Sequence, residues 1–340
     1  MFSALNNYYL KTIQSQPSIY RHFYNKKQST CFWSILSTCL HLTYFAKLRS
    51  FIADYKPNII VCTHPFPAIV ISRMKQLGLN IPLAVAITDY GYNEAWYVQG
   101  INMLLVTTKE QQSFAMIKGI SRERIYISGV PIASEFKPAA PKDKPKIKKQ
   151  LGLEEKLPVV LIMGGGLGLT MGPDQLQSIR NSTTPKQIVL ITGNNKQLYS
   201  KLTLKYKDQK SIHIQGWVDN IHQYMQAADF LLTKPGGVTI TEAMATETPI
   251  ILMEALPGQE EENLDFLLKN RAALYYEQEK HGSMATFLDT VIADTKQLED
   301  ISKNASLLLS SHSPEDIARL LNTRMNLSAT GFGGAYYGLS

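Results

Sequence analysis

The chain has 340 residues, of which 44% are hydrophobic and 19% charged, a composition typical of folded rather than disordered proteins. This length accommodates two domains of ordinary size. No uninterrupted apolar run reaches the ~20 residues that a bilayer-spanning helix needs, and the N-terminus lacks the pattern of a cleavable secretory signal.

The charge is divided unequally along the chain. Residues 1–150 hold 19 Lys and Arg against 7 Asp and Glu, whereas the remaining residues hold 16 basic against 21 acidic side chains. A basic half predicts contact with a polyanion, either nucleic acid or an anionic membrane surface, unless its charges simply face solvent. The scattered thiols of Cys31, Cys39 and Cys62 lack the spacing of a metal site and indicate a reducing cytoplasm.

Residues 1–55 combine aromatic and basic side chains at mostly helical spacing, interrupted by Pro17. Amphipathic rings beside Lys and Arg suit the headgroup region of an anionic bilayer. Each ring is equally expected in the core of its own domain, so only the combination favours a membrane. The residues concerned are Tyr8, Tyr9, Lys11, Tyr20, Arg21, His22, Phe23, Tyr24, Lys26, Lys27, Phe32, Trp33, Tyr44, Phe45, Lys47 and Arg49.

Strands and helices alternate from residue 57 to residue 132. Strands are predicted over residues 57–63, 83–88, 103–107 and 124–128, and helices over residues 68–77 and 109–118. This alternation predicts a parallel sheet with helices on both faces. Ligands bind at the carboxyl ends of such strands, where His64 and Asp89 are placed.

A Pro- and Lys-rich stretch over residues 137–156 separates this region from a second series of strand and helix units. It predicts a linker that runs into a short helix over residues 144–151. Strands are then predicted over residues 158–163, 187–192, 212–215, 230–232 and 250–253. The predicted division is an N-terminal α/β domain (1–140), a linker (141–157), a C-terminal α/β domain (158–325) and a tail (326–340).

The most informative motif is Thr233-Lys234-Pro235-Gly236-Gly237-Val238-Thr239-Ile240-Thr241-Glu242-Ala243, which ends a buried strand and opens a helix over residues 239–246. The two glycines allow a tight turn and a close approach of the backbone to a ligand. The first N–H groups of the helix favour a phosphate. Glu242, one turn inside, is placed to accept hydrogen bonds from a sugar hydroxyl.

A second polar loop strengthens this interpretation, because a glycine turn alone is common in α/β proteins. The strand over residues 250–253 leads into Pro257-Gly258-Gln259-Glu260-Glu261-Glu262-Asn263. Since neighbouring parallel strands end at the same edge of a sheet, these carboxamides and carboxylates are expected close to the glycine turn.

The block from Gly216-Trp217-Val218 to Asn263 resembles the nucleotide-sugar domain of the MurG-like glycosyltransferases. Within that group the chain is most similar to the diacylglycerol glucosyltransferases of Gram-positive bacteria and the plant monogalactosyldiacylglycerol synthases, over about residues 5–325. The resemblance implies the GT-B fold, in which two Rossmann-like domains with parallel sheets face each other across a cleft. It also implies that the first strand and glycine-rich loop of the N-terminal domain are missing from this sequence.

The resemblance implies a UDP-sugar in the C-terminal half. The loop 164–168 would face the diphosphate, unless it is a plain α/β turn, and the main chain at Trp217-Val218 would recognise uracil. Glu242 would hold the ribose, and Gln259 with Glu260 would read the sugar hydroxyls, unless 260–262 is only an exposed acidic run. The predicted donor-binding residues are Gly165, Gly166, Gly168, Asn194, Trp217, Val218, Gly236, Gly237, Val238, Thr239, Glu242, Gln259, Glu260 and Asn263.

The resemblance places the catalytic base, which accepts the proton of the acceptor hydroxyl, in the N-terminal half. Asp89 matches the catalytic aspartate of the family and is predicted to remove the proton of the acceptor hydroxyl; its alternative role is a helix cap or turn. The family has a histidine shortly before a tryptophan, whereas this chain keeps Trp96 and has Asn93 at the matching position. Asn93 cannot accept a proton at neutral pH but can orient a hydroxyl or Asp89. His64 is the alternative proton acceptor.

These residues together predict an enzyme that transfers glucose or galactose from a UDP-sugar to diacylglycerol or a related lipid, with inversion. It would be cytoplasmic and peripheral on the inner face of the cell membrane. The alternatives are a transferase for another lipid-linked acceptor and a nucleotide-sugar-binding protein with reduced or no turnover. We expect no tightly bound metal, no cofactor besides the donor, and no nucleic acid, because no base-stacking or groove-reading motif is present.

Overall fold

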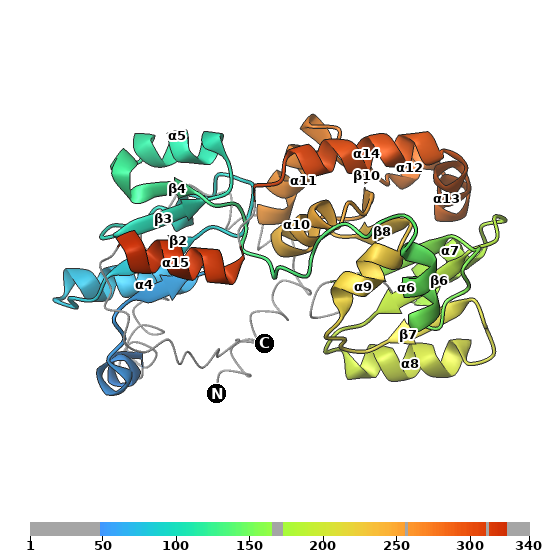
Figure 1. Cartoon of the computed structure of the whole chain (residues 1–340), viewed down its shortest axis with the longest axis horizontal. Coiled ribbons are helices and arrows are strands. Elements are labelled where there is room, and N and C mark those ends of the chain that lie inside the picture. Colours follow the sequence, from blue (N-terminus) through green and yellow to red (C-terminus); the bar gives the residue numbers. More distant parts are fainter. Residues whose placement is uncertain (1–47, 165–172, 256–257, 311–312, 325–340) are drawn as a thin grey trace.

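The computed structural model describes residues 48–164, 173–255, 258–310 and 313–324, which form two lobes, each built on a parallel sheet (Figure 1). Most of the aromatic and basic N-terminal segment lies outside the described residues. The segment before residue 48, where the first strand is predicted to be missing, and the predicted tail also lie outside the described residues. The predicted α/β class with two parallel sheets is confirmed.

The described part of the N-terminal lobe contains four parallel strands in the order β1-β2-β3-β4. Every residue of β2 and β3 is buried, because the sheet is covered on both faces. Residues 48–55 are helical. The other elements are β1 Ile60–Cys62, α4 Pro65–Gln76, β2 Leu83–Ala86, η1 Glu94–Trp96, β3 Met103–Val106, α5 Lys109–Ile117, η2 Arg122–Arg124 and β4 Ile125–Ile127.

Among the described residues, the C-terminal sheet has six parallel strands in the order β10-β9-β8-β5-β6-β7. This is a doubly wound sheet whose strand order reverses between β5 and β8, the point where such sheets bind ligands. Its strands are β5 Val159–Met163, β6 Gln187–Ile191, β7 Ile212–Gln215, β8 Phe230–Thr233, β9 Ile250–Leu252 and β10 Leu274–Tyr275. Its helices are α6 Lys144–Gln150, α7 Pro173–Arg180, α8 Lys196–Tyr206, α9 Ile221–Ala227, α10 Gly237–Ala245, α11 Gln259–Lys269, α12 Gln278–His281, α13 Met284–Ala293 and α14 Thr295–Leu307.

The central strand β5 shows why the runs of apolar residues predict these strands. Val159, Leu161 and Met163 belong to one core cluster, whereas Val160 and Ile162 belong to another. Successive side chains of a strand point to opposite faces, and here both faces are buried. A continuous apolar sequence is therefore required at this position.

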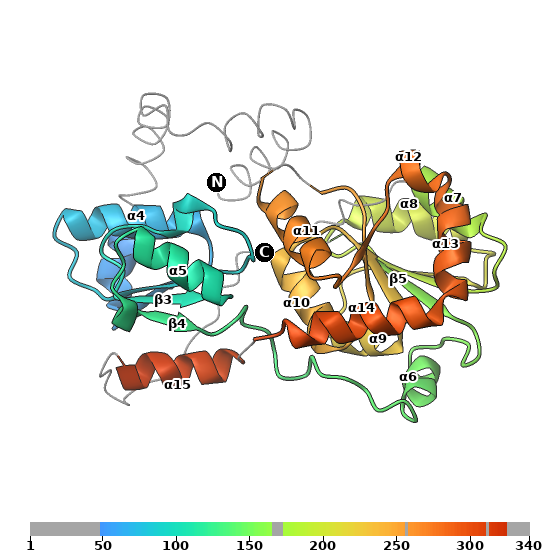
Figure 2. The ribbon, with the colours of Figure 1, turned by 90° about the horizontal axis from the view of Figure 1, so that it is seen from above.

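The last described helix, α15 Pro314–Arg324, returns to the N-terminal lobe (Figures 1 and 2). Its Ile317 and Leu321 pack against Ala84 and Ala86 of β2 in one core cluster. The predicted division assigns this segment to the C-terminal domain, whereas in the structure it packs against the N-terminal sheet. The small alanines leave room for a helix to approach this face of the sheet closely.

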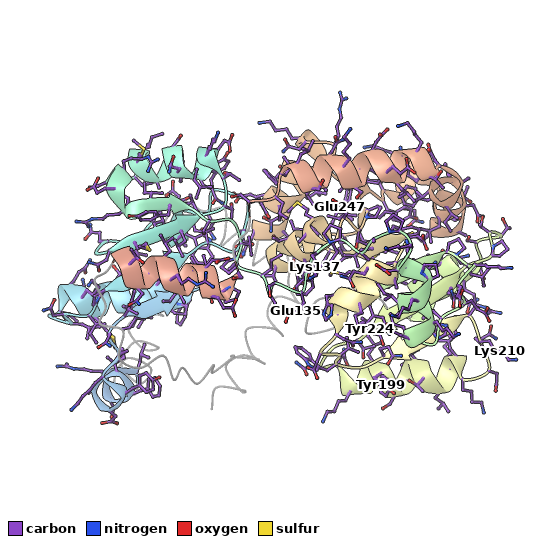
Figure 3. All side chains as sticks on the ribbon, viewed as in Figure 1. Glu135, Lys137, Tyr199, Lys210, Tyr224 and Glu247 are labelled. Atoms are coloured by element: carbon purple, nitrogen blue, oxygen red, sulfur yellow. The ribbon has the colours of Figure 1, made fainter. Side chains whose placement is uncertain are left out.

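The connection between the lobes runs past Glu135 and Lys137 (Figure 3). Gln226 of α9 donates a hydrogen bond to the carbonyl of Lys137 at 2.8 Å. Further along, Lys144 and Lys148 of α6 form ion pairs with Asp229 at 2.8 and 3.3 Å. The later part of the linker is thus attached to the C-terminal lobe.

Candidate functional site

The turn between β8 and α10 lies where the strand order of the C-terminal sheet reverses. Thr233 ends β8, and Gly236 is the N-cap of α10. The first hydrogen bond within the helix joins the N–H of Ile240 to the carbonyl of Gly236. The amides of residues 237–239 therefore have no partner within the helix and can bind an anion. The predicted strand, turn and helix are confirmed, with the helix beginning two residues earlier than expected.

Glu242 lies on α10, one turn after these amides, and is half-buried. Burial raises the pKa of its carboxyl group to about 7. Within the described part of the chain, its carboxylate receives no hydrogen bond from protein. A carboxylate removed from water in this way is stabilised by ligand hydroxyl groups, which suits the predicted role in holding a ribose.

The start of α11 is fixed against the turn that precedes α10. Glu260 is buried and forms an ion pair with Lys234. Asn263 is fully buried and donates a hydrogen bond to the carbonyl of Pro235 at 3.0 Å. The two polar segments that follow β8 and β9 are therefore brought together, as the sequence predicts.

Asp89 follows β2 of the N-terminal lobe and meets α11 of the C-terminal lobe. It is only 4% exposed. Its carboxylate accepts hydrogen bonds from Nε2 of Gln259 and, at 3.2 Å, from Nδ2 of Asn263. Burial raises the pKa of Asp89 to about 6; the two amide hydrogen bonds oppose this rise, and the charges of Glu262 and Glu260 add to it. A carboxyl group with this pKa is suited to general base catalysis near neutral pH.

Tyr90 inserts from the N-terminal lobe into the core of the C-terminal lobe. Its ring stacks on Phe266 with 4.5 Å between centroids, and its hydroxyl lies 2.8 Å from Oγ1 of Thr241. Its N–H donates to Oδ1 of Asn263 at 2.8 Å. The lobes are thus packed together at the loop that carries Asp89.

Two glycines permit this close approach. A Cβ added at Gly237 would lie 1.9 Å from the carbonyl oxygen of Thr88, and one added at Gly91 would lie 1.8 Å from Oε2 of Glu262. Glu262 also accepts a hydrogen bond from the N–H of Tyr92 at 2.8 Å. Gly237 therefore serves the contact between the lobes as well as the turn for which the sequence predicted it.

Asn93 and His64 both act as helix caps. The side chain of Asn93 accepts a hydrogen bond from the N–H of Ala95 at 3.0 Å, and Nδ1 of His64 accepts one from the N–H of Phe66 at 3.2 Å. His64 is exposed, although partial desolvation lowers its pKa below the ordinary value. Neither cap is hydrogen-bonded to Asp89 among the described residues, and the catalytic roles of both remain predictions.

The residues predicted to lie around the uracil end of the nucleotide follow β6 and β7. Trp217 is 60% exposed, and its indole N–H donates to Asp219 at 3.0 Å. Val218 packs partly into the core, and Asn194 is exposed. Tyr199 of α8 (Figure 3) lies against Gly216, just before Trp217. Gly165, Gly166 and Gly168 lie outside the described residues.

Several residues of this region are not predicted from the sequence. They reach the site only through contacts between segments distant in the chain, or through backbone groups. One local pattern indicates a tightly packed loop. Directly after the aspartate that ends a strand, two tyrosines flank a glycine in Tyr90-Gly91-Tyr92. The residues missed are Tyr90, Thr107, Gln111, Thr241 and Glu262.

In the described part of the chain, no group of three or more His, Cys, Asp or Glu side chains is arranged to hold a metal ion. No helix there is both long and apolar enough to cross a membrane.

Two known families match successive parts of the chain. Residues 1–132 match the family described as monogalactosyldiacylglycerol (MGDG) synthase, and residues 143–308 match the glycosyl transferases group 1. A processive diacylglycerol beta-glucosyltransferase of Staphylococcus saprophyticus is 29% identical over 321 residues, covering 94% of this chain and 77% of that protein. The protein of the same name from Staphylococcus epidermidis is 27% identical over 334 residues, covering 98% and 78%.

Solved structures share this fold. Anabaena HepE in complex with UDP-glucose superposes with a TM-score of 0.55 at 15% sequence identity, covering 83% of this chain and 81% of that one. MurG from Acinetobacter baumannii also superposes with a TM-score of 0.55 at 15% identity, covering 81% and 76%.

Proposed function

We propose that this chain transfers glucose or galactose from a UDP-sugar to diacylglycerol or a related lipid. The chain belongs to the glycosyltransferases of the GT-B fold, with an MGDG synthase domain ahead of a glycosyl transferase group 1 domain. One observation carries the proposal. The carboxylate of Asp89, with its pKa of about 6, lies against Gln259 and Asn263 at the start of α11. A candidate base from one lobe thereby touches the residues predicted to hold the donor sugar in the other.

The donor would lie along the carboxyl ends of the C-terminal strands. Its diphosphate would accept hydrogen bonds from the amides that open α10, which favour negative charge without a bound cation. Glu242 would accept hydrogen bonds from the ribose, and the main chain at Trp217-Val218 would contact uracil. Gln259 and Glu260 would bind the hydroxyls of the sugar. No resident metal or further cofactor is part of this proposal.

The reaction is a single displacement at the anomeric carbon. Asp89 removes the proton of the acceptor hydroxyl as its oxygen attacks that carbon. The bond from the carbon to the diphosphate oxygen breaks, and UDP leaves with the bonding electrons. Attack from the face opposite the leaving group inverts the configuration.

The acceptor is proposed to arrive from an anionic membrane on the cytoplasmic side. The first 50 residues hold six Lys and Arg and no Asp or Glu. In the helix over residues 48–55, Phe51 and Tyr55 are exposed and stack with 5.7 Å between centroids. Exposed aromatic rings beside Lys and Arg side chains suit the headgroup region of such a membrane.

The proposal is tested by incubating the full chain with UDP-glucose or UDP-galactose and vesicles that contain diacylglycerol. We expect release of UDP and formation of a glycolipid with one donor in preference to the other. Flotation with anionic and with neutral vesicles tests the membrane contact, which should weaken at high salt. Absence of glycolipid with both donors would refute the proposal.

The second candidate is a nucleotide-sugar-binding protein with reduced or no turnover. Asn93 favours this second function. It stands where the family that the chain resembles has a histidine, and its side chain caps η1. In that case UDP would bind, and neither donor would be consumed. The same incubation, accompanied by a UDP-binding measurement, separates the two functions.

Replacing Glu242 by Gln is expected to weaken UDP binding. At pH 8, above its pKa of about 7, the carboxylate is ionised and makes charge-assisted hydrogen bonds to the ribose. Loss of that charge should lower the affinity about tenfold or more, as measured by calorimetry. Glu247→Gln is the control, because Glu247 is exposed just after α10 (Figure 3). Equal affinities of the Glu242 variant and the wild type would remove Glu242 from the binding site.

Turnover is expected to fall as the pH is lowered through about 6. The base acts in its deprotonated form, and burial raises the pKa of Asp89 from 3.8 to about 6. The value of kcat/KM, which reports the free enzyme, should therefore decrease by at least about tenfold per pH unit below that pKa, because protonation of Glu242 below pH 7 adds to the loss. The measurement is kcat/KM from pH 5 to pH 8 with saturating vesicles. A flat profile over this range would contradict the assignment of Asp89.

A further inference from the structure

The loop Asp89–Tyr92 has no regular secondary structure, yet its main chain is held from two sides. The N–H groups of Tyr90 and Tyr92 donate to Asn263 and Glu262 of the C-terminal lobe. The carbonyl groups of Asp89 and Gly91 accept hydrogen bonds from within the N-terminal lobe. A loop fixed through its backbone holds its side chain in one place.

The groups that hold the carbonyls come from Gln111 and Thr107. Nε2 of Gln111 donates to the carbonyl of Asp89 at 2.8 Å and to that of Gly91 at 2.6 Å. Its Oε1 accepts from the N–H of Thr107 at 2.9 Å. The hydroxyl of Thr107 lies 2.9 Å from the carbonyl of Asp89 and 2.8 Å from Oε1 of Gln111, so its single proton serves one of them at a time.

The carboxamide of Gln111 is completely buried, at the start of α5. A buried amide is costly unless both of its ends are paired, and here the oxygen and the nitrogen are both used. A glutamate at this position would place a carboxylate against two carbonyl oxygens. The site therefore requires a side chain that donates and accepts at once.

We propose that Gln111, together with Thr107, is a positioning residue that holds the carboxylate of Asp89 in the orientation needed for proton transfer. This inference rests on the proposed function, in which Asp89 is the base. The two residues belong to the same lobe as Asp89, so their hold does not depend on contact with the other lobe. The contacts of Asn263 and Glu262 complete the arrangement when the lobes meet.

The test compares Gln111→Ala with Gln112→Ala, which changes the same residue type one position along α5. The structure gives the Gln112 side chain no hydrogen bond to the described residues. Gln111→Ala should lower kcat by about ten- to a hundredfold, because a small displacement of a catalytic group costs this much. The KM for the UDP-sugar should stay within about twofold, since donor groups lie on the other lobe. Gln112→Ala should match the wild type in both.

Hydrogen–deuterium exchange of the loop gives a second measurement that needs no turnover. Exchange over residues 88–93 should be faster in Gln111→Ala, by about tenfold, and unchanged in Gln112→Ala. If the wild-type chain does not transfer sugar, the proposed function fails, and exchange still decides whether Gln111 holds the loop. Unchanged exchange together with unchanged kcat would overturn the inference.

A conservative pair at Thr107 covers the case in which Gln111→Ala does not fold. Thr107→Val removes the hydroxyl at nearly constant volume, whereas Thr107→Ser keeps it. We expect the loss of kcat and the faster exchange in the valine variant, and recovery of both in the serine variant. Equal behaviour of the two variants would show that the hydroxyl has no positioning role.

Discussion

Replacement of Asp89 by Asn is expected to lower turnover at least about a hundredfold, the usual contribution of a general base, while UDP binding is retained. The amide has the shape of the carboxylate but cannot accept the proton of the acceptor hydroxyl. The hydrogen-bond network can be kept. The oxygen of the introduced amide would still face Nδ2 of Asn263, and Gln259 can turn its own amide to accept from the new NH₂ group.

The same substitution is expected to increase stability at pH 8. The folded pKa of Asp89, about 6, lies above its ordinary value of 3.8. The stabilisation from this carboxyl group is therefore complete below about pH 4 and is lost as the pH rises through 6. A neutral amide avoids the cost of the buried charge, on the order of 3 kcal/mol for a shift of this size.

Turnover, UDP affinity and the thermal midpoint at pH 8 should be measured for Asp89→Asn, with exposed Asp208→Asn as the control. A catalytic role predicts loss of turnover, unchanged affinity and a raised midpoint. Equal losses of turnover and affinity would instead make Asp89 a donor-binding residue.

The strands and the glycine turn could be predicted from the sequence because their causes are local. A strand buried on both faces must be apolar throughout, as in the run Val159–Met163. A turn that opens a helix toward an anion needs glycines, and Gly236 and Gly237 supply them. The periodicity and the turn residues are therefore read directly from neighbouring positions.

The contacts between the lobes could not be predicted in this way. Asp89 meets Gln259 and Asn263, and Tyr90 meets Thr241, over separations of more than 150 residues. Nothing near Asp89 in the sequence indicates which side chains will cover it. The apolar face of α15 likewise indicates burial without indicating the sheet against which it packs.

The packing of Tyr90 links the contact between the lobes to the proposed catalytic site. Its hydroxyl meets Thr241, which also donates to the carbonyl of Gly237 at 2.7 Å. The helix that would bind the diphosphate is thus joined through one threonine to the loop that carries the base. A change in the contact between the lobes should therefore affect turnover before it affects the fold of either lobe.

Gly237→Ala tests this consequence most directly. The added Cβ would lie 1.9 Å from the carbonyl oxygen of Thr88 and 2.9 Å from Oδ1 of Asp89. Neither the backbone of Thr88 nor the buried Asp89 can yield without moving the lobes apart. Within α10 itself alanine is tolerated, because it is a better helix former than glycine. We therefore expect the C-terminal lobe to remain folded, and turnover to fall at least about tenfold because the base is displaced.

Small-angle X-ray scattering and turnover should be measured together for this variant. The radius of gyration should increase, since the lobes can no longer meet at Thr88. Gly236→Ala is the control for the arrangement of the lobes, because a Cβ there meets nothing within 4 Å. Wild-type scattering and wild-type turnover in Gly237→Ala would mean that the reaction does not require this contact, and that Asp89 acts in an arrangement where the two lobes are further apart.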